Sequence, residues 1–391
     1  MAGDPTSRDP IAEALRLLEA EEPGMELVNA YTELASGKGI DGAYAEAIAA
    51  AERAILLAKG LGLPEPARAL GVRGIARAFL GDAQGLADMR RGLALAVVQG
   101  LGRETAGLYN NLALIVWQYE GPGAALVLCE EGIEFCERRG IAGMAIWIAT
   151  QRLTFVAACG PSERALADVE SLAAHGEAAG YSTFIEARSV QLALRGRRGE
   201  GADATAAEQL VATARKTGGP ELIAMGFASA AALLLAGGHQ ERATAVLEEL
   251  EQTTGTRGDP YYAAALPGLL RCALALGEPA LAARLIGGVE PRIPLQQHAL
   301  ATCRAALAEA AGDRATAATA YADAATQWRR FGDLPELAYA LLGQGRCLVA
   351  LGMPEADSPL GEARDLFTAM GYAPAVSETD ALLHRATATT S

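Results

Sequence analysis

A glycine recurs every 39 or 40 residues along most of this chain. A fixed period of this length is typical of an array of repeats, in which each unit buries its apolar face only against its neighbours. An array also accommodates 391 residues, which is more than one compact core usually holds. The series runs Gly81, Gly121, Gly160, Gly199, Gly238, Gly277, Gly312 and Gly352, with spacings of 40, 39, 39, 39, 39, 35 and 40 residues.

The composition and the pattern around these glycines predict helices. Hydrophobic residues make up 51% of the chain and aromatic residues only 5%, so leucine and alanine, the best helix former, must fill the core. Apolar residues recur at helical spacing before Gly312, as at Leu300, Cys303 and Leu307. Gly312 then ends one helix, and Asp313 caps the next. Each unit is therefore predicted to be a helix, a turn and a second helix.

A second glycine series lies about half a period after the first and separates one helix pair from the next. Together the two series predict an all-α fold, a right-handed α-solenoid of about nine stacked antiparallel helix pairs. We expect residues 1–24 to form an N-terminal segment with a helix that could cap the array, residues 25–375 to form the array, and residues 376–391 to form a flexible tail. The second series comprises Gly62, Gly102, Gly140, Gly180, Gly219, Gly258, Gly332 and Gly371.

One step in the first series is short. It covers 35 residues, between Gly277 and Gly312, and contains Pro291 and Pro294. Because proline lacks a backbone donor, it interrupts regular helix. We expect the curvature of the array to change there.

Charge and cysteine usage restrict the setting and the partners. The formal charge of −14 argues against nucleic acid, because phosphate neutralisation needs clustered Lys and Arg. The densest basic spots, residues 195–198 and 329–330, are short, and we interpret them as charges that complement helix C-termini. Six cysteines lie in apolar helical runs without CxxC pairs, which indicates buried residues in a reducing compartment. With no signal-peptide pattern at the N-terminus and no apolar stretch as long as a membrane span, the sequence predicts a cytoplasmic protein.

The chain has one nucleotide-like motif, GxGxxG at Gly37, Gly39 and Gly42. That motif binds a pyrophosphate only where a strand leads into it, and residues 25–35 are helix-like instead. The four histidines are scattered through different repeats, and no GxSxG nucleophile motif is present. We therefore expect no cofactor, no metal and no catalytic residue, although residues distant in sequence could still assemble an active site.

The repeats resemble tetratricopeptide repeats. Gly-Asp or Gly-His at the turn and an alanine five residues later match the turn glycine and small packing residue of that family, whose standard unit has 34 residues. The longer unit here is similar to the C-terminal repeat region of bacterial adenylate/guanylate cyclase and LuxR-type ATPase regulators, and residues 67–140 carry this closer resemblance. The alanines are Ala165, Ala204, Ala243, Ala282 and Ala317.

This resemblance implies a module that binds a partner or inducer and restrains or releases an attached ATPase or effector in signal transduction. The chain departs from that plan, because it has no GxxxxGK[ST] phosphate loop, no cyclase-like segment and no basic DNA-reading helices after the last repeat. Within such a system it would be a detached sensor part or a stand-alone relative.

Polar residues on the first helices mark a candidate groove. First helices line the concave surface of such arrays, so Arg and Gln there could bind an acidic or amide-rich segment. These residues could equally satisfy helix ends or face solvent. The candidate groove comprises Arg73, Arg77, Asn110, Asn111, Trp117, Gln118, Trp147, Gln151, Arg152, Arg188 and Gln191.

Three functions remain open on the sequence. The leading hypothesis is an interaction or sensing module that holds a partner protein or peptide in its concave groove. The first alternative is a regulatory module that binds a small effector there, and the second is an enzyme with an unrecognised active site. The oligomeric state is not readable from the sequence.

Overall fold

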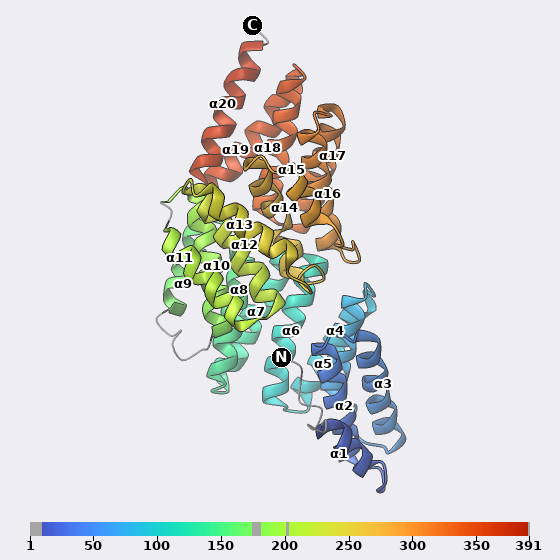
Figure 1. Cartoon of the computed structure of the whole chain (residues 1–391). Helices are drawn as coiled ribbons and strands as arrows, with labels where there is room; N and C mark the ends of the chain where they lie inside the picture. Colours follow the sequence, from blue (N-terminus) through green and yellow to red (C-terminus); the bar gives the residue numbers. More distant parts are fainter. Residues whose placement is uncertain (1–9, 174–180, 201–202, 390–391) are drawn as a thin grey trace. The chain divides into compact units, whose positions relative to one another are not determined.

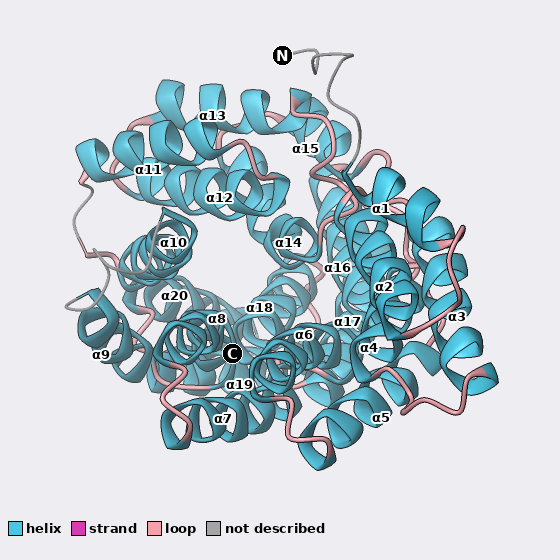
Figure 2. Ribbon diagram, turned by 90° about the horizontal axis from the view of Figure 1, so that it is seen from below, coloured by secondary structure: helices cyan, strands magenta, loops and turns pink. Residues whose placement is uncertain are grey.

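The computed structural model describes residues 10–173, 181–200 and 203–389. Every regular element in these ranges is a helix and none is a strand, so the predicted all-α class is confirmed (Figure 2). The helices follow one another as hairpins along the chain (Figure 1). The handedness predicted for the array stays a prediction.

The described helices form nine pairs, as the glycine series predicted. The first helices of the pairs are α2 (Met25–Ile40), α4 (Ala67–Phe79), α6 (Gly102–Glu120), α8 (Ala142–Cys159), α10 (Tyr181–Arg198), α12 (Pro220–Ala236), α14 (Pro260–Ala275), α16 (Pro294–Ala310) and α18 (Leu334–Ala350). The second helices are α3 (Tyr44–Gly60), α5 (Gln84–Val98), α7 (Pro122–Arg138), α9 (Ser162–Ala173), α11 (Ala204–Thr217), α13 (Gln240–Gln252), α15 (Pro279–Ile286), α17 (Arg314–Phe331) and α19 (Asp357–Met370). A short 3₁₀ helix (Pro354–Ala356) precedes α19, helix α1 (Pro10–Leu18) precedes the pairs, and α20 (Ala373–Thr389) follows them.

The turn chemistry explains where the hairpins bend. Gly312 has a φ of 85°, in the left-handed region that glycine adopts without a Cβ penalty. The Asp313 side chain then accepts a hydrogen bond of 3.2 Å from the backbone N–H of Thr316 and so caps α17. Asp203 caps α11 in the same way. The predicted break at Gly312 and Asp313 is confirmed.

Three local features bear on the sequence pattern: the first agrees with it, the second explains its short step, and the third was not indicated by it. The GxGxxG motif is the end of α2 followed by a turn at Gly42, so no strand leads into it. The short step before Gly312 reflects a short second helix, because α15 has only 8 residues. Helix α14 also contains Pro267 in its interior, a position that the repeat pattern did not indicate.

The C-terminal segment is helical, whereas the sequence predicted a flexible tail over residues 376–391. Helix α20 runs to Thr389 and buries Ala375, Thr379 and Leu382. These residues recur at helical spacing and give α20 an apolar face that packs on α19 and α18. The polar ending of the sequence concealed this face.

The chain divides into two compact units. Unit 1 comprises residues 1–119 and 127–148, and unit 2 comprises residues 120–126 and 149–391. Within unit 1, α4 and α5 approach closely because Gly74 and Gly85 face each other: a Cβ added to Gly74 would lie 2.6 Å from the Gly85 carbonyl oxygen. This contact leaves no room for a larger residue at either glycine.

In unit 2 the first helices pack on one another in succession, α10 on α12, α12 on α14 and α14 on α16. The end of this unit also contacts its beginning. The Ser162 hydroxyl, at the start of α9, donates a hydrogen bond of 2.7 Å to the carbonyl of Met370, at the end of α19. Gly121 lies against Phe331, so closely that a Cβ on Gly121 would sit 1.9 Å from the Phe331 carbonyl oxygen.

One described helix, α8, is long and apolar enough to cross a bilayer by length and composition alone. The core helix of a soluble protein can meet the same criteria of length and composition. In α8, 39% of the residues in the apolar window are buried inside the structure.

Candidate functional site

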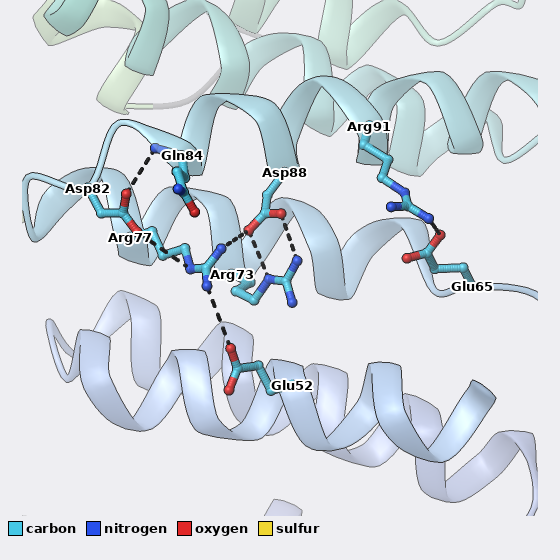
Figure 3. Close-up of polar contacts among 8 residues, drawn as sticks. All are labelled: Glu52, Glu65, Arg73, Arg77, Asp82, Gln84, Asp88 and Arg91. Carbon is cyan, nitrogen blue, oxygen red and sulfur yellow. Dashed lines mark hydrogen bonds and ion pairs between the residues drawn. The ribbon is translucent and has the colours of Figure 1, made fainter. Parts of the chain in front are cut away.

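Two arginines of the candidate groove are engaged by one carboxylate. Asp88, on α5, accepts hydrogen bonds from Arg73 at 2.8 and 2.6 Å and from Arg77 at 2.9 Å. Figure 3 shows both guanidinium groups turned toward Asp88 from the neighbouring helix α4. Asp88 is largely buried, so these charge-assisted bonds hold the hairpin α4–α5 together.

Arg152 repeats this arrangement in unit 2. It lies on α8 and donates a hydrogen bond of 2.9 Å to Asp168, on the second helix of the same hairpin. Its Nε is sealed from solvent and has no hydrogen-bond partner. Arg73, Arg77 and Arg152 thus each contact the second helix of their own pair, in the manner of structural ion pairs.

The amides and aromatics of the candidate groove divide between core and surface. Trp117 and Gln118 are buried, and the Gln118 amide donates to the Leu114 carbonyl on its own helix. Asn110 donates to the side chain of Asn111, and its own side-chain oxygen is sealed without a partner. Trp147 is 52% exposed, so it is the most accessible aromatic side chain of the set.

The members of the set on α8 and α10 in unit 2 are buried or partly buried. Gln151 is buried, and its side-chain oxygen lacks a partner. Arg188 donates to the side chain of Gln191 on the same helix, and burial lowers the pKa of Arg188. The set includes residues of both units, and the groove stays a prediction.

A second set of polar residues, which the sequence did not single out, lies inside unit 2. We call it the arginine cluster: Arg197 on α10, Arg271 on α14, Glu336 and Tyr339 on α18, and Tyr372 between α19 and α20. Four separate parts of the chain supply these side chains. The cluster therefore exists only because the end of unit 2 packs against its beginning.

Arg271 and Glu336 form the firmest contact of the arginine cluster. Two hydrogen bonds of 2.7 and 2.6 Å join the guanidinium to both carboxylate oxygens, the bidentate geometry of strong ion pairs. The Arg271 guanidinium carbon also lies 4.0 Å from the centre of the Tyr339 ring, a cation–π contact. Burial disfavours the charged form, but Glu336 holds the pKa of Arg271 above its ordinary value.

Arg197 is different, because it has no carboxylate partner among the described residues. Its one hydrogen bond runs 3.4 Å to the Tyr372 hydroxyl, and its guanidinium carbon lies 5.9 Å from the centre of that ring. Burial opposes its charge, while Tyr372, Tyr339 and Glu336 hold the pKa of Arg197 above the ordinary value. A guanidinium has five N–H donors, and most of those of Arg197 find no acceptor among the residues that the structure describes.

Asp333 borders the arginine cluster as the N-cap of α18. Its side chain accepts a hydrogen bond of 3.0 Å from the backbone N–H of Glu336. Burial, followed by the negative charge of Glu336, raises the pKa of Asp333 well above its ordinary range. Burial, together with the Asp333 charge, also raises the pKa of Cys159 to about 11. Asp333 therefore holds its proton to a higher pH than an ordinary aspartate does.

The sequence carried only a weak signal of this cluster. The basic run at residues 195–198 predicts helix-end charges, and Arg198 agrees with this prediction because it pairs with Glu200. A charged residue within the apolar helix α14, at Arg271, was the better signal. Its partner Glu336 is 65 positions away, and nothing in the local pattern connects the two.

The described residues contain no group of three His, Cys, Asp or Glu side chains that could hold a metal ion. All six cysteines are free, and burial raises the pKa of Cys136, Cys272 and Cys347. A raised thiol pKa reduces the thiolate fraction and hence nucleophilicity. These thiols behave as small apolar residues.

No protein-family model matches this chain, and no curated protein matches it either. Two solved structures align along nearly all of it at low identity. A circular tandem repeat protein with novel repeat topology is 16% identical, with 97% of this chain and 96% of that chain covered and a TM-score of 0.27. A chain of the APC/C hetero-tetramer Cut9–Hcn1 is 11% identical, with 97% and 90% covered and a TM-score of 0.30.

Proposed function

We propose that this protein is a helical-repeat module that binds a protein or peptide partner on the first helices of unit 2. The observation that carries the proposal is the uninterrupted packing of α10, α12, α14 and α16, which places four helices side by side as one surface element. Stacked helices of this kind provide the shaped, partly apolar surface that extended or helical segments dock into.

An exposed aromatic side chain supports this reading. Phe184 lies near the start of α10, the first of these four packed helices, and is 51% exposed. A large aromatic residue left in solvent is typical of the anchor positions of interfaces. The candidate groove residues Gln151, Arg188 and Gln191 lie on α8 and on α10 itself.

We further propose that binding serves regulation in signal transduction in the cytoplasm. This part of the proposal rests on the resemblance of residues 67–140 to the repeat region of ATPase and cyclase regulators. A small effector remains the second candidate ligand, and the enclosed arginine cluster favours it, because such a site suits a compact polar molecule.

A displayed library of random 12-residue peptides, selected on the purified full chain, tests the proposal. We expect enriched peptides that bind with micromolar affinity in fluorescence anisotropy and that lose about tenfold or more in affinity when Phe184 is replaced by serine. The matched control is Val98→Ser, a change at an 85% exposed apolar residue of unit 1, which should leave the affinity unchanged. A selection without enrichment, or equal losses in both variants, would contradict the proposal.

A further inference from the structure

Arg197 places a positive charge inside unit 2 that no carboxylate of the described residues pairs with directly. Removing a charged group from water is costly unless a counter-charge or hydrogen bonds replace the water. Arg271 meets this condition through Glu336, whereas the described part of the chain offers Arg197 only the Tyr372 hydroxyl, at 3.4 Å. The difference between these two neighbouring arginines identifies Arg197 as the incomplete member of the cluster.

The Arg197 side chain is not fully buried. The residue keeps part of its surface exposed, and it is not among the four described residues with a sealed, partnerless side-chain atom. Its neighbour Arg271 is also partly accessible, with 29% of the side chain exposed. A small group can thus approach the guanidinium.

The charges around Arg197 restrict what can bind there. Arg197 and Arg271 supply two positive charges, and Glu336 supplies one negative charge. Asp333, whose proton is favoured by burial and by Glu336, adds little negative charge when that proton is present. With Asp333 protonated, the cluster has one net positive charge. A monoanion neutralises this charge, whereas a phosphate dianion would leave one net negative charge beside Glu336.

We propose that Arg197 binds a carboxylate group of a ligand, while the buried Tyr372 hydroxyl helps to hold the guanidinium in place. The planar guanidinium matches the two oxygens of a carboxylate, as the Arg271–Glu336 pair shows within the same cluster. The carboxylate can belong to a small molecule or to a peptide. In the peptide case the inference rests on the proposed function; in the small-molecule case it does not.

Thermal unfolding and calorimetry of the full chain test the site with named probes. Acetate and benzoate, both monoanions, are compared at 50 mM with chloride at equal ionic strength, near pH 6. We expect at least one carboxylate to raise the unfolding midpoint above the chloride value and to bind saturably. The variant Arg197→Gln should lose about tenfold or more of that affinity, because it removes a charged hydrogen-bonding partner.

The control variant is Arg242→Gln, which removes an exposed arginine paired with Glu208 on the surface of unit 2 and should not change binding. Circular dichroism establishes that each variant is folded. If Arg197→Gln does not fold, Arg197→Lys keeps the charge but loses the two-point geometry, and it should weaken binding as well. Absence of a carboxylate effect beyond chloride, or an equal effect in wild type and the Arg197 variant, overturns the proposal.

A second arm separates the two sources of carboxylate. Peptides selected for binding are compared with a free and with an amidated C-terminus, and with acidic residues replaced by their amides. If small carboxylates bind and no peptide does, the Arg197 site stands and the proposed partner binding fails. If peptides bind wild type and Arg197→Gln equally, partner binding stands and the carboxylate site fails.

Discussion

Arg271 and Glu336 are 65 positions apart in the sequence and form a two-point ion pair inside unit 2, at 2.7 and 2.6 Å. Only 6% of the Glu336 side chain is exposed. The pair joins α14 to α18, two helices that belong to different hairpins. The pair forms only when the helices near the end of unit 2 pack against those in its middle.

Glu336→Gln should destabilise the protein by about 3 kcal/mol, because it leaves the Arg271 charge enclosed without its partner. Urea unfolding followed by circular dichroism measures this loss. The matched control is Glu362→Gln, in the exposed pair of Arg329 and Glu362, which should cost about 1 kcal/mol or less. Equal losses in the two variants would show that the enclosed pair contributes no more than a surface pair.

Gly121→Ala should be strongly destabilising. The added Cβ would meet the Phe331 carbonyl oxygen at 1.9 Å, and the φ of 97° lies in the left-handed region. We expect a loss of about 2 kcal/mol or more in the free energy of unfolding.

The control for this substitution is Gly123→Ala, two residues later in α7. A Cβ there meets nothing within 4 Å, and the position is helical, so alanine should be neutral or stabilising by about 0.5–1 kcal/mol. If Gly121→Ala were as stable as Gly123→Ala, the close approach of Gly121 to Phe331 would be absent in solution.

Glu186→Gln should stabilise the protein at high pH only. Burial, with the charge of Glu221, raises the pKa of Glu186 from 4.5 to about 7. The stability that the protonated carboxyl contributes is complete below pH 4.5 and is lost as pH rises through 7. The glutamine variant should therefore be more stable than wild type above pH 7 and equal to it near pH 4.

Urea unfolding at pH 4, 6 and 8 measures this dependence. Glu248→Gln, on an exposed side chain of α13, provides the comparison and should show a constant difference from wild type at the three pH values. A Glu186→Gln variant with the same constant difference would contradict an enclosed carboxyl at this position.

The native thiols should react slowly with Ellman's reagent at pH 8. Five of the six free cysteines are buried, and the sixth, Cys159, is partly exposed with a pKa raised to about 11. Six thiols should react at once in guanidinium chloride, whereas the native protein should react first at Cys159. Fast reaction of a buried cysteine in the native state would contradict this packing, and Cys159→Ser identifies the first thiol.

The sequence indicated the hairpins because their signals are local. Gly312 and Asp313 are adjacent, and the backbone geometry and the cap that they provide act within one helical turn. The same argument accounts for the rejection of the GxGxxG motif at Gly37, since the helix that contains it is visible from neighbouring residues. The prediction from local signals was wrong for α20. The apolar positions of this helix are separated by polar residues, in a segment that ends in threonines.

The paired helices and the positions of their turns follow from the sequence alone, because each depends on residues a few positions apart. The tertiary structure decided what the polar side chains do. It turned Arg73 and Arg77 toward Asp88, although the sequence had suggested a groove for them. It also brought Arg197 and Arg271 near Glu336, which hydrogen-bonds Arg271 and not Arg197. Such contacts depend on the packing of distant helices, and helical spacing along the chain does not encode them.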